Sequence, residues 1–191
     1  MKISSNQLEI NILLFKIMKL IYKLMEEIKI IMLGLCAGKT SFLNRYFDNS
    51  FIEPMLYTYG IDCQKKIVLL PNGKEVGLVL YDTPGPERYK SINYNYIKEV
   101  DGIILMYNIR EERSFKNISD LIKGVRELNN NIPVIIIGNM CDEEEYRIIS
   151  KEEGEELANE YNYHFYESSN KLNINIEEPI NDLIEQILKK R

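Results

Sequence analysis

The chain has 191 residues, of which 45% are hydrophobic and 28% are charged, and its formal net charge is −5. That length suits one domain with a substantial core, and the composition is that of a globular protein rather than a disordered or collagen-like chain. The acidic balance disfavours a broad nucleic-acid-binding surface, so we expect no RNA- or DNA-binding module.

The three cysteines, Cys36, Cys63 and Cys141, are scattered along the chain, and no two have CxxC spacing. Their number and spacing argue against a disulfide framework or a zinc site and indicate free thiols in a reducing cytosol. The single histidine, His164, lies in a tyrosine-rich strand, and no Ser-His-Asp or Cys-His catalytic arrangement can be built on it. We therefore expect a cytoplasmic protein that is not secreted.

Apolar runs rich in β-branched residues alternate with stretches of helical periodicity. Strands are predicted at residues 28–33, 67–70, 77–81, 103–107 and 134–137. Helices are predicted at residues 39–47, 114–128, 151–161 and 177–190. The dipeptide Asn72-Gly73 predicts a hairpin between the second and third of these strands. Ser150 and Glu153 form a capping-box pattern at the start of the third helix.

This alternation predicts an α/β domain with a mainly parallel six-stranded sheet, one antiparallel edge strand and helices on both faces. Ligands of such sheets bind beyond the carboxyl ends of the strands. Each motif described below follows such a strand end, and this agreement between levels supports the prediction. We place the domain at residues 27–191 and treat residues 1–26 as an N-terminal extension.

A glycine-bearing loop with the sequence GLCAGKT joins the first strand to the first helix at residues 34–40. Such a loop directs backbone N–H groups and the helix N-terminus toward phosphate. We expect Lys39 to reach the β- and γ-phosphates and Thr40 to bind Mg²⁺. The motif G-x-x-x-x-G-K-[ST] has four residues between its glycines, but only three separate Gly34 from Gly38. The missing residue should remove or redirect one amide of the phosphate cradle.

Four later stretches resemble, in order and spacing, the nucleotide-contacting motifs of Ras-superfamily GTPases, and most closely those of the Rab branch. They are YTYGID at residues 57–62, YDTPGPERY at 81–89, GNMCD at 138–142 and ESSNK at 167–171. With the phosphate loop, the resemblance covers about residues 28–188. It implies a Ras-like G domain, which is a P-loop NTPase fold, and a switch that binds GTP or GDP with Mg²⁺. For Rab proteins it also implies a role in vesicle transport.

The resemblance assigns the metal and γ-phosphate contacts residue by residue. Thr40 and Thr58 would bind Mg²⁺, and Asp82 would hold it through a bound water, because magnesium prefers hard oxygen ligands and keeps several waters. The contact of Thr58 would exist only with GTP, which is how one phosphate orders a loop. Gly85 would offer its backbone N–H to the γ-phosphate.

The resemblance also assigns the guanine contacts. Asp142 would accept hydrogen bonds from the guanine N1–H and exocyclic amine, a donor pair that adenine lacks. Asn139 would tie the loops together near the base, and Phe51 would pack edge-on against it. This pattern disfavours a P-loop ATPase or nucleotide kinase. The implied nucleotide-binding residues are Gly34, Ala37, Gly38, Lys39, Thr40, Ser41, Phe51, Thr58, Gly85, Asn139, Asp142, Ser169, Asn170 and Lys171.

Pro86 and Met140 depart from the family pattern at positions that act on the nucleotide. Pro86 stands where the family has the glutamine that orients the attacking water, and proline has neither a side-chain acceptor nor an N–H. We therefore assign no catalytic residue and expect slow GTP hydrolysis. Met140 replaces the lysine that covers the base, so we expect weaker affinity with guanine preference retained through Asp142. A pseudo-GTPase that binds partners with little nucleotide control is the alternative interpretation.

Residues 51–63 and 82–96 correspond to the surfaces through which the family contacts effectors, exchange factors and activating proteins. In the aromatic patch that Rab effectors touch, Cys63 replaces a phenylalanine and Tyr81 replaces a tryptophan, whereas Tyr96 is retained. The chain is therefore expected to present an altered patch to effectors of this kind.

The N-terminal extension combines apolar and basic residues at helical spacing. Its apolar residues include Leu8, Ile12, Phe15, Leu20 and Leu24, and its lysines are Lys16, Lys19 and Lys23. The apolar runs are too short for a membrane span, and the cleavage pattern of a signal peptide is missing. Three interpretations remain: peripheral contact with the cytosolic face of an endomembrane, packing on the domain, or translation from Met25.

The chain ends Lys189-Lys190-Arg191 without the cysteines that are prenylated in Rab proteins. This sequence is therefore not expected to carry a lipid by that route. A truncated sequence, or attachment through the N-terminal extension, would each account for the difference.

Overall fold

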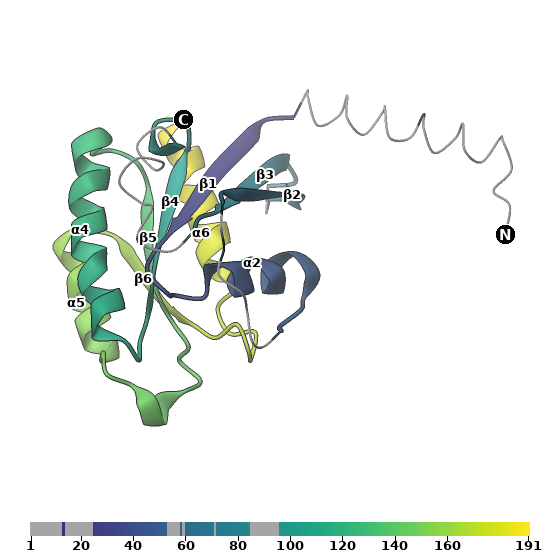
Figure 1. The fold of residues 1–191 in the computed structure, drawn as a ribbon. Coiled ribbons are helices and arrows are strands. Elements are labelled where there is room, and N and C mark those ends of the chain that lie inside the picture. The colour runs from purple at the N-terminus through teal and green to yellow at the C-terminus, as the bar shows by residue number, and fades with distance from the viewer. Residues whose placement is uncertain (1–12, 14–24, 53–57, 59, 71, 85–95) are drawn as a thin grey trace, which may run out of the picture.

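The computed structural model describes residues 13, 25–52, 58, 60–70, 72–84 and 96–191 (Figure 1). The strands are β1 (Glu27–Leu33), β2 (Asp62–Leu69), β3 (Glu75–Asp82), β4 (Gly102–Asn108), β5 (Val134–Asn139) and β6 (His164–Ser168). The helices are α2 (Lys39–Asp48), α4 (Glu112–Leu128), the short 3₁₀ helix η2 (Glu144–Tyr146), α5 (Lys151–Glu160) and α6 (Glu178–Lys190).

The six strands form one sheet in the order β2-β3-β1-β4-β5-β6. Only β2 runs antiparallel to its neighbour, and it lies at the edge. This confirms the predicted α/β fold with a mainly parallel sheet and one antiparallel edge strand. Because β1, β4, β5 and β6 are parallel, their carboxyl ends lie at one end of the sheet, where the loops that follow them meet.

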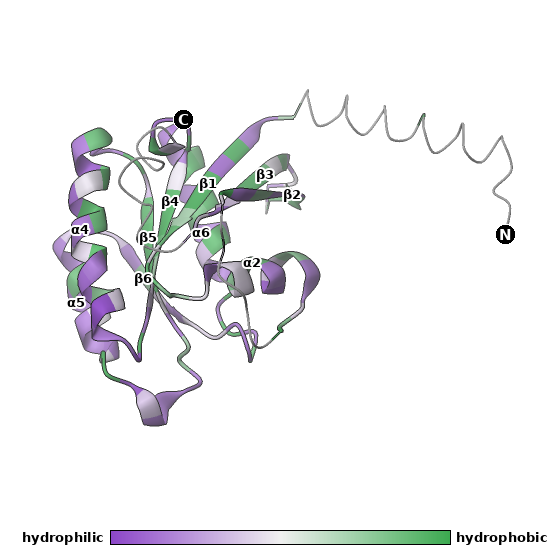
Figure 2. Ribbon diagram, in the orientation of Figure 1, coloured by the Kyte–Doolittle hydropathy of each residue, from purple (hydrophilic) through white to green (hydrophobic). Residues whose placement is uncertain are grey.

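Helices cover both faces of the sheet, with α4 and α5 on one side and α2 and α6 on the other (Figure 1). Apolar side chains such as Phe42 of α2 and Leu183 of α6 are fully buried against one face, and Ile118 and Ile122 of α4 against the other. Figure 2 shows the strands as the hydrophobic centre, with polar helix surfaces turned outward. The central strands β4 and β5 are buried along their whole length, as expected for strands covered on both faces.

The hairpin between β2 and β3 forms where Asn72-Gly73 predicted it. Gly73 has a φ of 80°, and its N–H donates to the carbonyl of Leu70 at 2.9 Å. The strand β2 begins at Asp62, five positions before the apolar run at residues 67–70 suggested. At the edge of the sheet, most of its side chains are exposed or half-buried, so its first half is polar and carries no hydrophobic signal.

The predicted capping box opens α5. The Ser150 hydroxyl accepts from the Glu153 N–H at 3.1 Å, and the Glu153 carboxylate accepts from the Ser150 N–H at 2.8 Å. Each side chain thus satisfies a backbone donor that the first helical turn leaves unpaired.

The C-terminal residue packs against the start of β1. Arg191 donates to the carbonyl of Glu27 at 3.1 Å and to Asp101 Oδ1 at 2.7 Å, and it also pairs with Glu26. The chain therefore enters β1 and leaves α6 at the same end of the sheet, opposite the phosphate loop that follows Leu33. Within the described part of the chain, no helix is both long enough and apolar enough to cross a membrane.

Candidate nucleotide-binding site

The phosphate loop leaves β1 through a backbone position that admits only glycine. Gly34 has a φ of 147°, and a Cβ atom there would lie 1.8 Å from the carbonyl oxygen of Met106. Gly38 caps α2 with a φ of 78°. Between them, Cys36 adopts the left-handed backbone conformation, with a φ of 48°. This conformation is uncommon for non-glycine residues because it brings atoms of the side chain and the backbone too close together. Both terminal glycines of the shortened loop therefore adopt positive φ angles. The loop is shorter by one residue in the segment between them.

Lys39 begins α2 and folds back over the loop. Its Nζ donates to the carbonyl of Gly34 at 2.6 Å, and the residue is only 7% exposed. Burial lowers the pKa of Lys39 below its usual value, while the negative charge of Asp82 opposes this shift. The ammonium therefore lies against the loop that is expected to hold the phosphates.

The three residues predicted to hold magnesium come together from separate elements. The Thr40 hydroxyl donates to Asp82 Oδ2 at 2.5 Å, and the hydroxyls of Thr40 and Thr58 lie 2.9 Å apart. Thr40 belongs to the first turn of α2, Asp82 ends β3, and Thr58 belongs to the first-switch segment. This set of oxygens suits a hard cation such as Mg²⁺.

Asp82 carries the feature that best fits a cation. The residue is 4% exposed, and its Oδ1 has no hydrogen-bond partner among the residues that the structure describes. Burial raises the pKa of this carboxyl above its ordinary range, while the hydrogen bond from Thr40 and the charge of Lys39 oppose the shift. A buried carboxylate oxygen without a partner is costly, and a cation or its bound water would satisfy it.

Asn139, at the end of β5, joins the three loops of the site. Its side chain is fully buried, and its Nδ2 donates to the carbonyl of Ala37 at 2.8 Å. Its Oδ1 accepts from the Ser168 hydroxyl at 3.0 Å. A second link comes from Asn170, whose Nδ2 donates to the carbonyl of Gly38 at 3.0 Å. The loops at 34–40, 139–142 and 168–171 are therefore held together, as predicted from their motifs.

Met140 and Asp142 follow Asn139 in the loop expected to read the base. Met140 has a φ of 72°, and its terminal methyl lies 3.5 Å from where a Cβ on Gly38 would stand. Its thioether thus lies beside the phosphate loop and offers no N–H or O–H donor to it. The half-buried Asp142 carboxylate makes no hydrogen bond or ion pair with any residue in the described ranges. Its acceptors are therefore available to the donor pair of guanine.

The remaining predicted residues differ in how far the structure places them. Ser169 is fully buried, and its N–H donates to the carbonyl of Ile174 at 3.1 Å, which closes a tight turn beside the exposed Lys171. Ser41 lies in the first turn of α2, and Phe51 is half-buried just beyond that helix. Gly85 and Pro86 lie outside the described residues, so the predictions made for them stay predictions.

The chain is similar in sequence to known GTPases of the Ras family. The model of the Ras family matches residues 29–189. The human Ras-related protein Rab-3A is 38% identical over 164 residues, which is 85% of this chain and 74% of the relative. Rab-10 of Diplobatis ommata is 39% identical over 155 residues, covering 81% of this chain and 77% of the relative. The bovine Rab-3C is 40% identical over 155 residues, covering 81% and 68% respectively.

This chain is a Rab-like member of the Ras superfamily of small GTPases. The resemblance inferred from the five motifs is thereby confirmed. Members of this family are GTP-binding proteins that hydrolyse GTP, and they use Mg²⁺ with the nucleotide.

The residues predicted to form an altered effector patch lie close together in this Rab-like chain. Cys63 pairs across the sheet with Tyr81, and the Cys63 thiol is exposed. The rings of Tyr81 and Tyr96 meet edge to face with centroids 5.8 Å apart. The patch therefore contains tyrosine rings, which carry polar hydroxyls, beside a thiol.

Two supports of the Rab-like site have no motif of their own. Ser114, in the first turn of α4, donates to the carbonyl of Leu35 at 2.6 Å and accepts from the Asn108 N–H at 3.0 Å. Ser114 therefore links the start of α4 to the shortened loop. Arg45 of α2 donates to the carbonyl of Asn170 at 2.8 Å. In both cases an acceptor is a distant backbone carbonyl, which leaves no pattern in the sequence.

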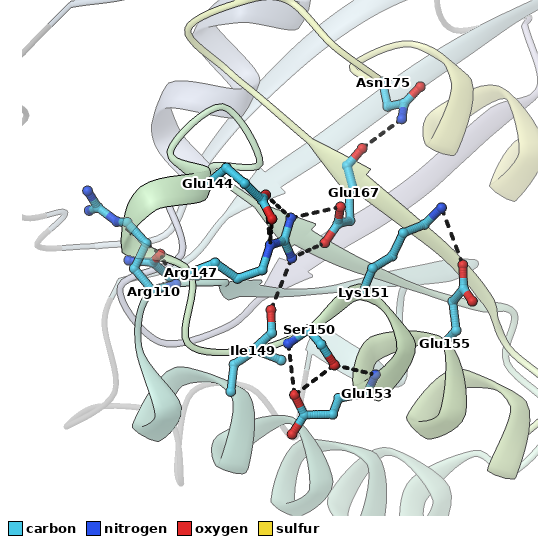
Figure 3. Close-up of polar contacts among 11 residues, drawn as sticks. Arg110, Glu144, Arg147, Ile149, Ser150, Lys151, Glu153, Glu155, Glu167 and Asn175 are labelled. Carbon is cyan, nitrogen blue, oxygen red and sulfur yellow. Dashed lines mark hydrogen bonds and ion pairs between the residues drawn. The ribbon is translucent and has the colours of Figure 1, made fainter.

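A third support is Arg147, which joins the two loops that are expected to contact the base (Figure 3). Its Nη1 and Nη2 donate to the two carboxylate oxygens of Glu167 at 2.6 and 3.1 Å, and its Nε donates to the Glu144 carboxylate. The side chains of Arg147 and Glu167 are only 16% and 13% exposed. The hydrogen bonds to Glu167 raise the pKa of Arg147 above its usual value. Because Glu167 directly precedes Ser168, the pair holds the start of the 168–171 loop.

Replacing Arg147 by methionine is expected to lower the free energy of unfolding by about 2–3 kcal/mol, because it leaves the Glu167 carboxylate largely buried without its partner. Urea unfolding at a fixed nucleotide concentration would measure the change. The matched control is Lys151→Met, since Lys151 pairs with Glu155 at 3.5 Å on the exposed surface of α5 (Figure 3). The control is expected to change stability by less than about 0.5 kcal/mol. Equal effects of the two substitutions would contradict the assignment.

Proposed function

We propose that this chain is a Rab-like GTP/GDP switch that binds guanine nucleotide with Mg²⁺ and presents residues 51–63 and 82–96 to effector, exchange-factor and activating proteins. The contact between the hydroxyls of Thr58 and Thr40, 2.9 Å apart, carries this proposal. It joins the first-switch segment to a residue expected to bind the metal. A γ-phosphate and Mg²⁺ bound there would stabilise one position of that segment, and their loss would release it.

The cellular role that we infer is vesicle-mediated transport on the cytosolic side of an endomembrane. The support is the similarity to Rab-3A, Rab-10 and Rab-3C over most of the chain. The altered patch around Cys63, Tyr81 and Tyr96 favours an effector of its own over one shared with these relatives.

Asp142 is proposed to select guanine. Its carboxylate would accept two hydrogen bonds from guanine, and adenine would leave it without donors. Freshly purified protein is expected to release GDP or GTP on denaturation, detected by mass spectrometry. Asp142→Ala is expected to weaken GDP binding by at least about a hundredfold, measured by titration calorimetry, because bonds to a charged acceptor are lost.

The control for that change is Asp120→Ala. Asp120 is a carboxylate whose side chain is 80% exposed on α4, and its substitution is expected to leave GDP binding unchanged. Competition with ATP supplies the second readout, since ATP is expected to displace guanine nucleotide poorly from the unsubstituted protein. Displacement by ATP as readily as by GTP would contradict guanine selection. No uptake of either GDP or GTP would favour the pseudo-GTPase alternative.

Pro86 is proposed to make hydrolysis slow, because it cannot orient the attacking water as glutamine does. Single-turnover hydrolysis by protein loaded with GTP is expected to be slower than about 10⁻⁴ s⁻¹. Pro86→Gln is expected to raise that rate roughly tenfold while leaving the dissociation rate of GDP unchanged, since the substitution adds a side-chain amide that can orient the attacking water and removes no base contact. An ordinary family rate in the unsubstituted protein, unaffected by Pro86→Gln, would show that the proline is not limiting.

Residues 1–26 are proposed to contact a membrane surface. In support, β1 begins at the end of the sheet remote from the phosphate loop, next to Arg191. An extension bound to a membrane there would leave the nucleotide loops facing away from the lipid. The basic and apolar composition of the extension suits an interface with anionic lipid.

Sedimentation with anionic vesicles tests this contact. The full chain is expected to co-sediment, and to do so less at high salt because the lysines contribute electrostatic attraction. A chain beginning at Met25 is expected to stay in the supernatant. Equal behaviour of the two chains would rule out the extension as the membrane contact.

A further inference from the structure

Arg45 connects the end of α2 to the base-reading loop. Its Nε donates to the carbonyl of Asn170 at 2.8 Å, and its Nη2 donates to the carbonyl of Lys171 at 3.2 Å. Its Nη1 donates to both the carbonyl and the side-chain oxygen of Asn49, at 3.0 and 3.1 Å. All three nitrogens of the guanidinium therefore donate hydrogen bonds. Their acceptors belong to two segments that lie far apart in the sequence, Asn49 and residues 170–171.

The same guanidinium also lies over the ring of Phe51, with its Cζ atom 5.9 Å from the ring centroid. Phe51 follows Asn49, which ends α2 in the left-handed conformation with a φ of 49°. The direction in which the chain leaves α2, and so the position of the ring, is thus tied to the guanidinium through Asn49. Arg45 contacts both sides of the expected guanine position, the ring at one edge and the backbone of residues 170–171 at the other.

We propose that Arg45 is a positioning residue for guanine, which sets the lifetime of bound nucleotide by fixing Phe51 and the 170–171 backbone in their binding geometry. This inference rests on the proposed function and adds a determinant of affinity that acts through other residues. A preorganised site avoids the cost of ordering its loops when the ligand binds. A lysine at position 45 would keep the charge but lose the planar fork, and a single ammonium cannot serve acceptors on both sides.

The positioning role of Arg45 is expected to matter more in this chain because position 140 carries a methionine. A methionine at this position can cover the base but cannot donate a hydrogen bond to the phosphate loop. Polar links among the described residues still tie residues 168–171 to α2 and the loop before it. They include the bond from Asn170 to the carbonyl of Gly38 at 3.0 Å and the bonds from Arg45.

The position of Arg45 also predicts which nucleotides are affected. It acts on the base side of the site, whereas Thr40, Thr58 and Asp82 gather on the metal side. Loss of its contacts should therefore speed the dissociation of GDP and of GTP by the same factor. A residue that acted through the metal or the first switch would change the two nucleotides by different factors.

Arg126 of α4 offers a closely matched control. Its Nε donates at 2.9 Å to Oδ1 of Asn130, four residues on, and Nη1 of Arg45 donates at 3.1 Å to Oδ1 of Asn49, also four residues on. Its Cζ lies 5.3 Å from the centroid of the Tyr161 ring. The chemistry of the two arginines is thus alike, but α4 covers the opposite face of the sheet from α2 (Figure 1).

The experiment uses the full chain loaded with fluorescent GDP or GTP and measures dissociation into excess unlabelled nucleotide at fixed Mg²⁺. Arg45→Lys is expected to raise both dissociation rates about tenfold, and Arg45→Met by more, because charge-assisted hydrogen bonds are lost. Arg126→Lys and Arg126→Met are expected to stay within about twofold of the unsubstituted protein, since their contacts lie on the other face. Melting temperatures are recorded for each variant in saturating GDP.

Unchanged dissociation from Arg45→Lys would overturn the inference, as would an equal rise in Arg126→Lys or a rise confined to GTP. A lower melting temperature with unchanged dissociation would assign Arg45 a structural role only, and would also overturn it. If Arg45→Met does not fold, Arg45→Lys decides the question alone. An unsubstituted protein that retains neither nucleotide would overturn the proposed function itself, which is distinguishable from failure of the Arg45 variants.

Discussion

The buried carboxamide of Asn139 is the contact on which the rest of the site depends. It donates to the carbonyl of Ala37 and accepts from the Ser168 hydroxyl, so one side chain satisfies groups of two other loops. These loops can meet because β1, β5 and β6 are parallel and end at the same edge of the sheet. Leaving a buried amide without a partner costs roughly 1–3 kcal/mol. Each loop therefore stabilises the arrangement of the others, before any ligand is considered.

Much of the fold follows from local signals that the core reinforces. The runs in β4 and β5 are wholly buried, so their uninterrupted apolar sequence predicts them well. The turn at Gly73 and the capping box at Ser150 are local chemistry, readable within four residues. The first half of β2 was not predicted, because an edge strand exposed to solvent needs no apolar residues. Its pairing depends on β3, which the sequence of β2 alone does not reveal.

The residues of the site likewise fall into two groups, those that a local motif predicts and those that act through distant contacts. Thr40, Asp82 and Asn139 were predicted because each belongs to a motif that follows a strand end, and the structure brings them together with their loops. Arg45, Ser114 and Arg147 were missed. Ser114 and Arg45 donate to carbonyls 79 and 125 residues away, and a backbone carbonyl has no residue type to recognise. Their contribution is to hold the loops, which motif reasoning takes for granted.

The shortened phosphate loop shows how the two kinds of residue combine. Its ends are held in place, because Gly34 lies against the carbonyl of Met106 and Gly38 is the N-cap of α2. The backbone therefore adjusts to the shorter length within residues 35–37. There Cys36 adopts a positive φ, and the Ser114 hydroxyl donates to the carbonyl of Leu35. The part of the loop that carries Lys39 and Thr40 stays in register with Asp82 and Asn139. The shortening is thus confined to residues 35–37, while the residues proposed for the metal and base sides of the site keep their contacts with one another.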